Sequence, residues 1–117
     1  MRTPINMTNH TYWNLSGDFK HKTVADHSLQ INSNKILDFN KFQIPTGQIL
    51  PVANTPFDFN SKQKIGDKDR LCGSIDGGGK PGIDHAYVIG TDPNSNSTMF
   101  VAGKLECEGR SMEIMTT

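Results

Sequence analysis

The sequence has 117 residues, which is room for one domain and not for two. Its 12 basic residues balance its 12 acidic ones, so a nucleic acid or an anionic membrane is not expected as a partner, because both attract a basic excess. The apolar fraction of 34% is low for a self-sufficient core of this size.

Residue types favour strands over helices along the whole chain. Ile, Val and Thr together number 24, whereas Ala, Leu and Glu together number 13. Branching at Cβ restricts a helix and suits a pleated strand. No stretch repeats apolar residues at helical spacing. We therefore expect an all-β fold.

In the first half of the chain, alternation of apolar and polar residues predicts short strands. They cover residues 4–12, 27–31, 35–39 and 48–53. Residues 44–47 predict a turn, because Pro45 presets φ at its second position and Gly47 ends it. The strand that follows is expected at a sheet edge because it contains Pro51. Two aromatic residues within 55–59 are expected to pack against the sheet.

The second half predicts a loop and then three more strands. Residues 67–82 are rich in glycine and aspartate and predict a loop, and residues 92–97 predict a polar turn. Strands are expected at 86–90, 98–109 and 111–117, with a tight connection at Gly109 and Arg110. Residues 77–82 match G-x-G-x-x-G, but the strand and helix that a dinucleotide site requires do not flank them.

Several classes of site and compartment are not supported by the sequence. Cys72, Cys107 and the four histidines lack the spacings that close a zinc site, and no nucleophile elbow occurs. We predict neither a metal nor a cofactor. Two cysteines are too few for a disulfide scaffold, and neither a signal peptide nor a transmembrane run is present, so we expect a cytoplasmic protein.

The most unusual stretch is residues 9–15, which place His10 among two amides, a hydroxyl, a phenol and an indole. Aromatic faces stack on the C–H surface of a sugar, while amides and hydroxyls bind its hydroxyl groups. A histidine among them can donate a proton near neutral pH. The plainer interpretation is a strand end in which Tyr12 and Trp13 are core residues and His10 is merely hydrogen-bonded. Residue types alone favour that plainer interpretation.

Asp84 and His85 follow the glycine-rich loop and precede an expected strand. A carboxylate at the start of a strand can accept hydrogen bonds from two vicinal hydroxyls, which suits a sugar. The plainer interpretation of Asp84 is an aspartate that caps the loop, and by itself the pattern favours it.

Residues 4–17 closely resemble the N-H-[ST]-Y-[FW]-N-L segment of the aldose 1-epimerases, also called galactose mutarotases. The resemblance continues in the order of that family and covers nearly the whole chain. Its further segments are residues 26–31, 44–49, 55–59, 65–66 and 84–85.

This resemblance implies a fold and a chemistry. The fold would be part of a large antiparallel β-sandwich, the galactose mutarotase-like supersandwich. The activity would interconvert the α and β anomers of free aldoses such as glucose and galactose, without metal or cofactor. By similarity, His10 matches the general acid that protonates the ring oxygen, Thr11 and Tyr12 match the sugar site beside it, and Asp84 matches the aspartate that binds sugar hydroxyls.

The chain also departs from the family pattern. The family's general base is a glutamate in a downstream motif, and Glu106, Glu108 and Glu113 do not match it. A second histidine and an Asn-Arg pair belong to a region upstream, and a Gln-Pro-Gly motif usually follows the strand matching 112–117. We therefore expect residues 1–117 to be a single incomplete domain, truncated at both ends and inactive alone. The alternatives are a non-catalytic sugar-binding or structural remnant, or one piece of a fused epimerase.

Overall fold

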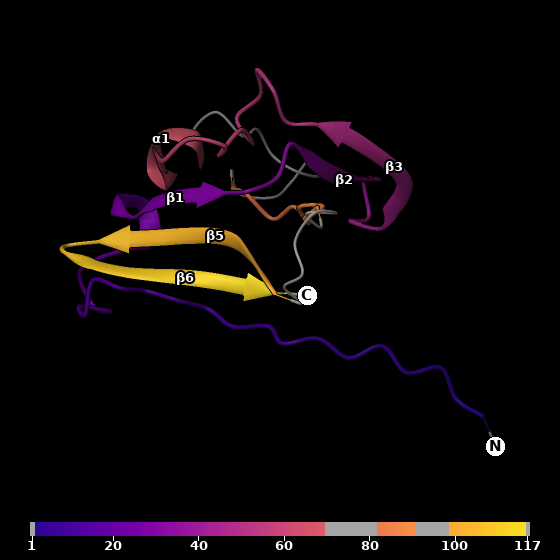
Figure 1. The fold of residues 1–117 in the computed structure, drawn as a ribbon, viewed down its shortest axis with the longest axis horizontal. Helices are drawn as coiled ribbons and strands as arrows, with labels where there is room; N and C mark the ends of the chain where they lie inside the picture. The colour runs from indigo at the N-terminus through magenta and orange to yellow at the C-terminus, as the bar shows by residue number, and fades with distance from the viewer. Residues whose placement is uncertain (1, 70–81, 91–98, 117) are drawn as a thin grey trace.

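The computed structural model describes residues 2–69, 82–90 and 99–116. These residues form two antiparallel sheets and two short helical segments, so the all-β expectation is confirmed (Figure 1). The larger sheet has the order β4-β1-β5-β6, and the smaller one pairs β2 with β3. No helix in the described ranges is long and apolar enough to cross a membrane. The elements are η1 Val24–Asp26, β1 Ser28–Ile31, β2 Lys35–Phe39, β3 Pro45–Pro51, β4 Gln63–Lys64, α1 Ile65–Asp69, β5 Phe100–Cys107 and β6 Arg110–Thr116.

The β5–β6 hairpin is the longest pairing and agrees with the two strands predicted at the C-terminal end. Its connection lies one residue earlier than predicted, at Glu108 and Gly109. Both residues have positive φ, 48° and 79°, as a two-residue turn between twisted strands requires. Along β5 the burial alternates, with Gly103, Leu105 and Cys107 buried. This alternation gives the sheet one inner face.

Gly103 lets β5 approach β1 closely. A Cβ built on Gly103 would lie 2.7 Å from the backbone oxygen of Gln30 on the neighbouring strand. The strand register also shifts between Val101 and Gly103, which marks a bulge at this point. A backbone oxygen cannot move aside without breaking the β1–β5 ladder, so only glycine fits at this position.

The Gly103→Ala variant is expected to unfold more easily. Its methyl group meets backbone rather than a flexible side chain, and overpacking of this kind costs about 1–3 kcal/mol of unfolding free energy. Urea denaturation followed by circular dichroism measures the difference. Gly90→Ala is the matched control, because its added Cβ would meet open space and its unfolding midpoint should not fall. Equal midpoints for Gly103→Ala and the unaltered chain would contradict the close approach.

The β2–β3 hairpin confirms the strand at 35–39 but corrects the turn predicted at 44–47. The chain reverses earlier, because the Asn40 side-chain oxygen accepts hydrogen bonds from the backbone N–H groups of Phe42 and Ile44, at 2.9 and 3.2 Å. The predicted strand at 48–53 accordingly starts earlier, so that β3 begins at Pro45. Gly47, with φ of 87°, lies within β3, where the pairing register is irregular. The glycine therefore serves a bulge rather than a turn.

The strand predicted for residues 4–12 is wrong for the described structure. This segment is exposed and belongs to neither sheet, and it leaves the body of the molecule (Figure 1). Ile5 and Met7, which alternate with polar neighbours, are 75% and 86% exposed. Alternation makes a segment suitable for a sheet, but a strand forms only where another edge supplies hydrogen bonds. No described strand pairs with residues 4–12.

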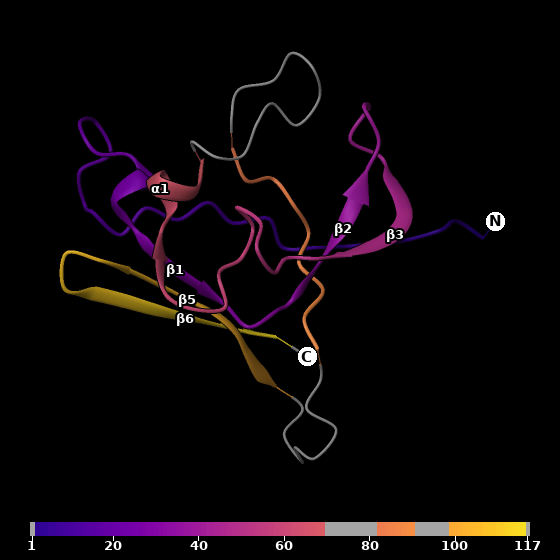
Figure 2. The same cartoon turned by 90° about the horizontal axis from the view of Figure 1, so that it is seen from above.

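The strand predicted for residues 86–90 is wrong. In the structure this segment makes one isolated antiparallel bridge. The bridge joins Tyr87 to Ile36 of β2, and two backbone hydrogen bonds flank it, Leu37 N–H to Ala86 O and Val88 N–H to Lys35 O. Figure 2 shows this segment, in orange, running beside β2. Of the predicted loop at 67–82, the first residues belong to α1, and 70–81 lie outside the described residues. The polar turn at 92–97 also lies outside them.

The described core is small. Its buried apolar side chains are Ile36, Val52, Phe59, Leu105 and Cys107. Phe59 is fully buried, as expected for an aromatic residue packed against a sheet, and its carbonyl oxygen accepts a hydrogen bond from the Ile31 N–H. The low apolar content of the sequence thus corresponds to few buried side chains in the described structure.

Candidate functional site

The segment that carries His10 is open to solvent. The His10 ring stacks on Tyr12, with ring centres 5.0 Å apart, and the Thr11 hydroxyl donates a hydrogen bond to the Asn9 side chain at 2.8 Å. Tyr12 is 88% exposed and Trp13 is 40% exposed. The plainer interpretation, in which both rings are core residues, is therefore wrong for this structure. The segment presents an imidazole and an aromatic face together, without burying either.

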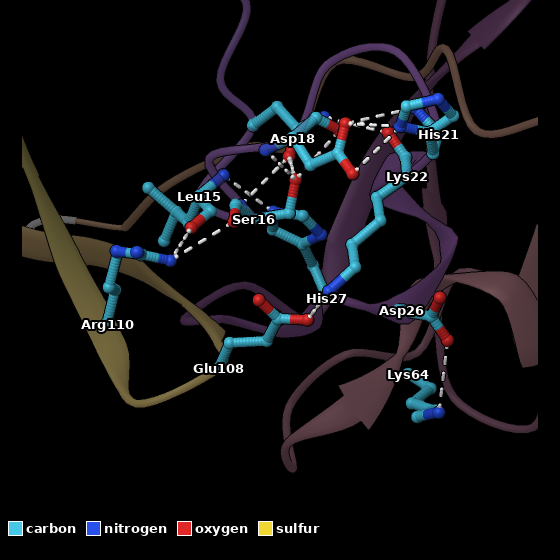
Figure 3. Close-up of polar contacts among 11 residues, drawn as sticks. Leu15, Ser16, Asp18, His21, Lys22, Asp26, His27, Lys64, Glu108 and Arg110 are labelled. Atoms are coloured by element: carbon cyan, nitrogen blue, oxygen red, sulfur yellow. Dashed lines mark hydrogen bonds and ion pairs between the residues drawn. The ribbon is translucent and has the colours of Figure 1, made fainter.

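Immediately after this segment the chain is anchored. The Asn14 side-chain oxygen accepts hydrogen bonds from the backbone N–H and the hydroxyl of Ser16, at 3.0 and 2.7 Å. Its amide donates to the Lys22 carbonyl at 3.2 Å. From the far end of the chain, the Arg110 guanidinium donates to the carbonyls of Leu15 and Ser16, at 2.9 and 3.2 Å (Figure 3). The start of β6 therefore holds the loop that follows His10.

His27 is the buried centre of this anchor. Its side chain is fully buried, and its Nε2 accepts a hydrogen bond from the Leu15 N–H at 2.7 Å (Figure 3). A nitrogen that accepts carries no proton, so the neutral ring carries its proton on Nδ1. Nδ1 is buried and has no hydrogen-bond partner among the residues that the structure describes. In the sequence, His27 stands out only as part of the segment 26–31. Its anchoring role depends on the contact with Leu15, which that segment does not reveal.

An ion pair lies beside this anchor. Lys22 binds Glu108 of the β5–β6 turn, and this hydrogen bond raises the pKa of Lys22 (Figure 3). Both side chains are almost half exposed, so this ion pair contributes little to stability.

Asp84 lies at a separate cavity of about 340 Å³. Asp84 is an exposed residue. The cavity lies between the β2–β3 hairpin and the segment 82–90. This places a carboxylate beside an aromatic wall, the combination that binds hydroxyl groups and C–H faces of a sugar. The lining residues are Phe39, Gln43, Asp84, His85 and Ala86.

The ring of His85 contacts two aromatic side chains. The Phe39 ring meets it edge-on, with ring centres 5.7 Å apart, and the Phe57 ring is tilted against it, with ring centres 4.1 Å apart. Burial lowers the pKa of His85, and the nearby carboxylates of Asp84 and Asp38 oppose that shift only in part. The imidazole is therefore neutral at neutral pH, and it faces the same cavity as Asp84.

The described structure keeps the predicted site residues in two groups. His10, Thr11 and Tyr12 share the exposed N-terminal segment, and Asp84 lines the cavity, whose lining does not include His10. The aromatic side chain of this cavity lining, Phe39, has no signal in the sequence that places it beside Asp84. Phe39 belongs to β2, and no short motif links it to Asp84.

The three glutamates differ in their surroundings. Glu106 accepts hydrogen bonds from Lys62 and Lys104 and forms ion pairs with both. These contacts lower the pKa of its carboxyl. A carboxylate with a lowered pKa is a weaker proton acceptor. Glu108 is engaged by Lys22, and Glu113 is exposed on β6. The lysine contacts therefore make Glu106 and Glu108 poor candidates for a general base.

Comparison with known proteins identifies similar sequences. The family model described as aldose 1-epimerase matches residues 1–113. A galactose mutarotase of Sus scrofa is 39% identical over 116 residues, which cover 98% of this chain and 31% of that protein. An aldose 1-epimerase of Haemophilus influenzae is 34% identical over 87 residues, covering 74% of this chain and 25% of that protein. The chain thus spans about a third or less of the length of these curated relatives.

Solved structures agree with the sequence comparison. An aldose epimerase homologue from C. elegans matches with a TM-score of 0.60 and 26% identity over 83% of this chain and 26% of that one. A galactose 1-epimerase from Lactobacillus acidophilus matches with a TM-score of 0.51 and 28% identity, over 72% of this chain and 23% of that one. The antiparallel sheets described above are therefore similar to part of a larger fold.

Proposed function

The chain belongs to the aldose 1-epimerase family, and we propose that it supplies the general acid and a sugar ligand to a site that interconverts the α and β anomers of aldoses. Free hexoses such as galactose and glucose are the proposed substrates. The match of the family model to residues 1–113 carries this proposal. The exposed His10 beside Tyr12, and the cavity beside Asp84, supply side chains suited to a sugar.

The proposed mechanism assigns one step to each group. His10 donates a proton to the ring oxygen while a carboxylate base removes the proton of the C1 hydroxyl, so the C1–O5 bond breaks and an open-chain aldehyde forms. Rotation about C1–C2 presents the other face of the aldehyde. Return of both protons closes the ring as either anomer. Thr11 and Tyr12 hold the sugar beside the acid, and Asp84 accepts hydrogen bonds from its hydroxyls.

Polarimetry tests this function directly. Freshly dissolved α-D-galactose changes its optical rotation slowly, and the protein that carries this chain is expected to accelerate the change. The same measurement with the 117-residue chain alone examines whether residues outside it supply the base. A rate equal to that of buffer for the protein that carries this chain would reject the epimerase assignment.

A second candidate is a sugar-binding chain without catalysis. It is favoured by one observation: Glu106 and Glu108 are both occupied by lysines and are poor candidates for a base. Titration calorimetry of the 117-residue chain with galactose separates the two functions. Heat of binding without any acceleration of mutarotation supports the binding role for this chain.

Asp84→Asn is expected to weaken galactose binding by about 10- to 100-fold. The amide keeps the size of the side chain but loses the negative charge, and hydrogen bonds to a charged group contribute roughly 1.5–3 kcal/mol. Titration calorimetry gives the Kd of both proteins. Asp67→Asn, on α1 and outside the cavity lining, is the matched control and should bind as the unaltered protein does. Unchanged affinity in Asp84→Asn would remove Asp84 from the sugar site.

A further inference from the structure

The two ring nitrogens of His85 differ in their surroundings. Nδ1 is buried and has no hydrogen-bond partner among residues 2–69, 82–90 and 99–116. His85 also lines the cavity beside Asp84. A buried N–H without an acceptor is rarer in proteins than an under-used lone pair. We therefore assign the proton of the neutral ring to Nε2.

The position of this ring is fixed from several sides. Phe39 and Phe57 hold it by edge-on and tilted contacts, with ring centres 5.7 and 4.1 Å away. The next residue along, Ala86, accepts a backbone hydrogen bond from Leu37 of β2 at 2.9 Å. A donor that is held in place loses little conformational entropy when a ligand binds to it.

From this geometry we propose that His85 is a second polar ligand of the sugar, donating a hydrogen bond from Nε2 to a hydroxyl whose neighbour is bound by Asp84. The inference rests on the proposed function, because it takes the cavity as a sugar site. Asp84 only accepts hydrogen bonds, whereas the neutral imidazole donates one. A sugar hydroxyl can do both, so the two residues together fix the orientation of a pair of hydroxyls. The lowered pKa of His85 keeps the ring in this neutral form at neutral pH.

The experiment compares two substitutions in the protein that carries this chain. His85→Phe keeps an aromatic ring against Phe39 and Phe57 but removes the donor, and we expect its Kd for galactose to rise about tenfold. His85→Gln places an amide N–H near the former position of Nε2 and should recover part of that loss. If His85 had only a structural role, His85→Phe would bind galactose more tightly than His85→Gln. Equal Kd values for His85→Phe and the unaltered protein overturn the inference.

The unaltered protein provides a second measurement that does not depend on how the variants fold. Nitrogen-15 spectra of the imidazole rings are expected to show the His85 proton on Nε2 and a shift of that signal when galactose is added. The exposed His21 is the matched control and should not respond. A proton on Nδ1, or a signal unmoved by saturating galactose, overturns the role of His85. No galactose binding by the unaltered protein would overturn the proposed function itself, whereas binding that is lost in Asp84→Asn but kept in His85→Phe overturns only this inference.

Discussion

Replacing His10 with alanine is expected to remove most of the acceleration of mutarotation. General acid catalysis contributes about 10²–10⁴-fold, and a methyl group cannot protonate the ring oxygen. The effect should appear in kcat more than in the Kd for galactose, because proton transfer occurs only on the way to the open-chain aldehyde. Polarimetry measures the rate, and titration calorimetry measures binding in the same samples.

Two further variants separate proton transfer from general disturbance. His10→Asn keeps a hydrogen-bonding side chain of similar reach but cannot give up a proton under these conditions, so it should be as slow as His10→Ala. His21→Ala removes another exposed histidine and should retain the full rate. Activity of His10→Ala within threefold of the unaltered protein would assign the acid to another residue.

Replacing His27 with alanine is expected to lower the free energy of unfolding by about 2–5 kcal/mol. The variant loses a fully buried ring and leaves the Leu15 N–H without its acceptor. Chemical denaturation followed by circular dichroism measures the loss. His21→Ala is the control here as well, since the His21 side chain is 78% exposed and its removal should change stability by less than about 0.5 kcal/mol.

His27→Gln separates the hydrogen bond from the packing. The glutamine side-chain oxygen can take the place of Nε2 and accept from the Leu15 N–H, so this variant should be more stable than His27→Ala. Similar stability for His27→Ala and His21→Ala would mean that the loop after His10 is not anchored by His27. We also expect His27→Ala to slow mutarotation, because that loop sets the path of the segment that carries His10.

Local signals were sufficient where a structure depends on neighbours in sequence. The β5–β6 hairpin could be predicted because long alternation flanks Gly109, which supplies positive φ at the turn. The turn predicted at residues 44–47 is wrong, because the types of Pro45 and Gly47 do not show which side chain closes the loop. The Asn40 side chain closes the loop earlier, and Gly47 serves a bulge in β3.

Pairing between distant segments could not be predicted in the same way. Alternation in residues 4–12 is suitable for a strand, yet no described strand supplies an edge to that segment. Residues 86–90 do lie along β2, but they share only one bridge with it. Period-two alternation describes the two faces of a strand and carries no information about which edge lies next to it.

The sequence by itself determined the strand-rich class, the family resemblance, and the two places where sugar chemistry is expected, at His10 and at Asp84. These depend on residue types at short spacing, which a linear pattern can record. Tertiary structure alone decided how they are supported: His27 binds Leu15 across 12 positions, and Arg110 binds it across 95. It also placed the His85 ring against Phe39 and Phe57. Such contacts depend on chain reversals and strand pairing, so they exist only once the sheets have brought distant residues together.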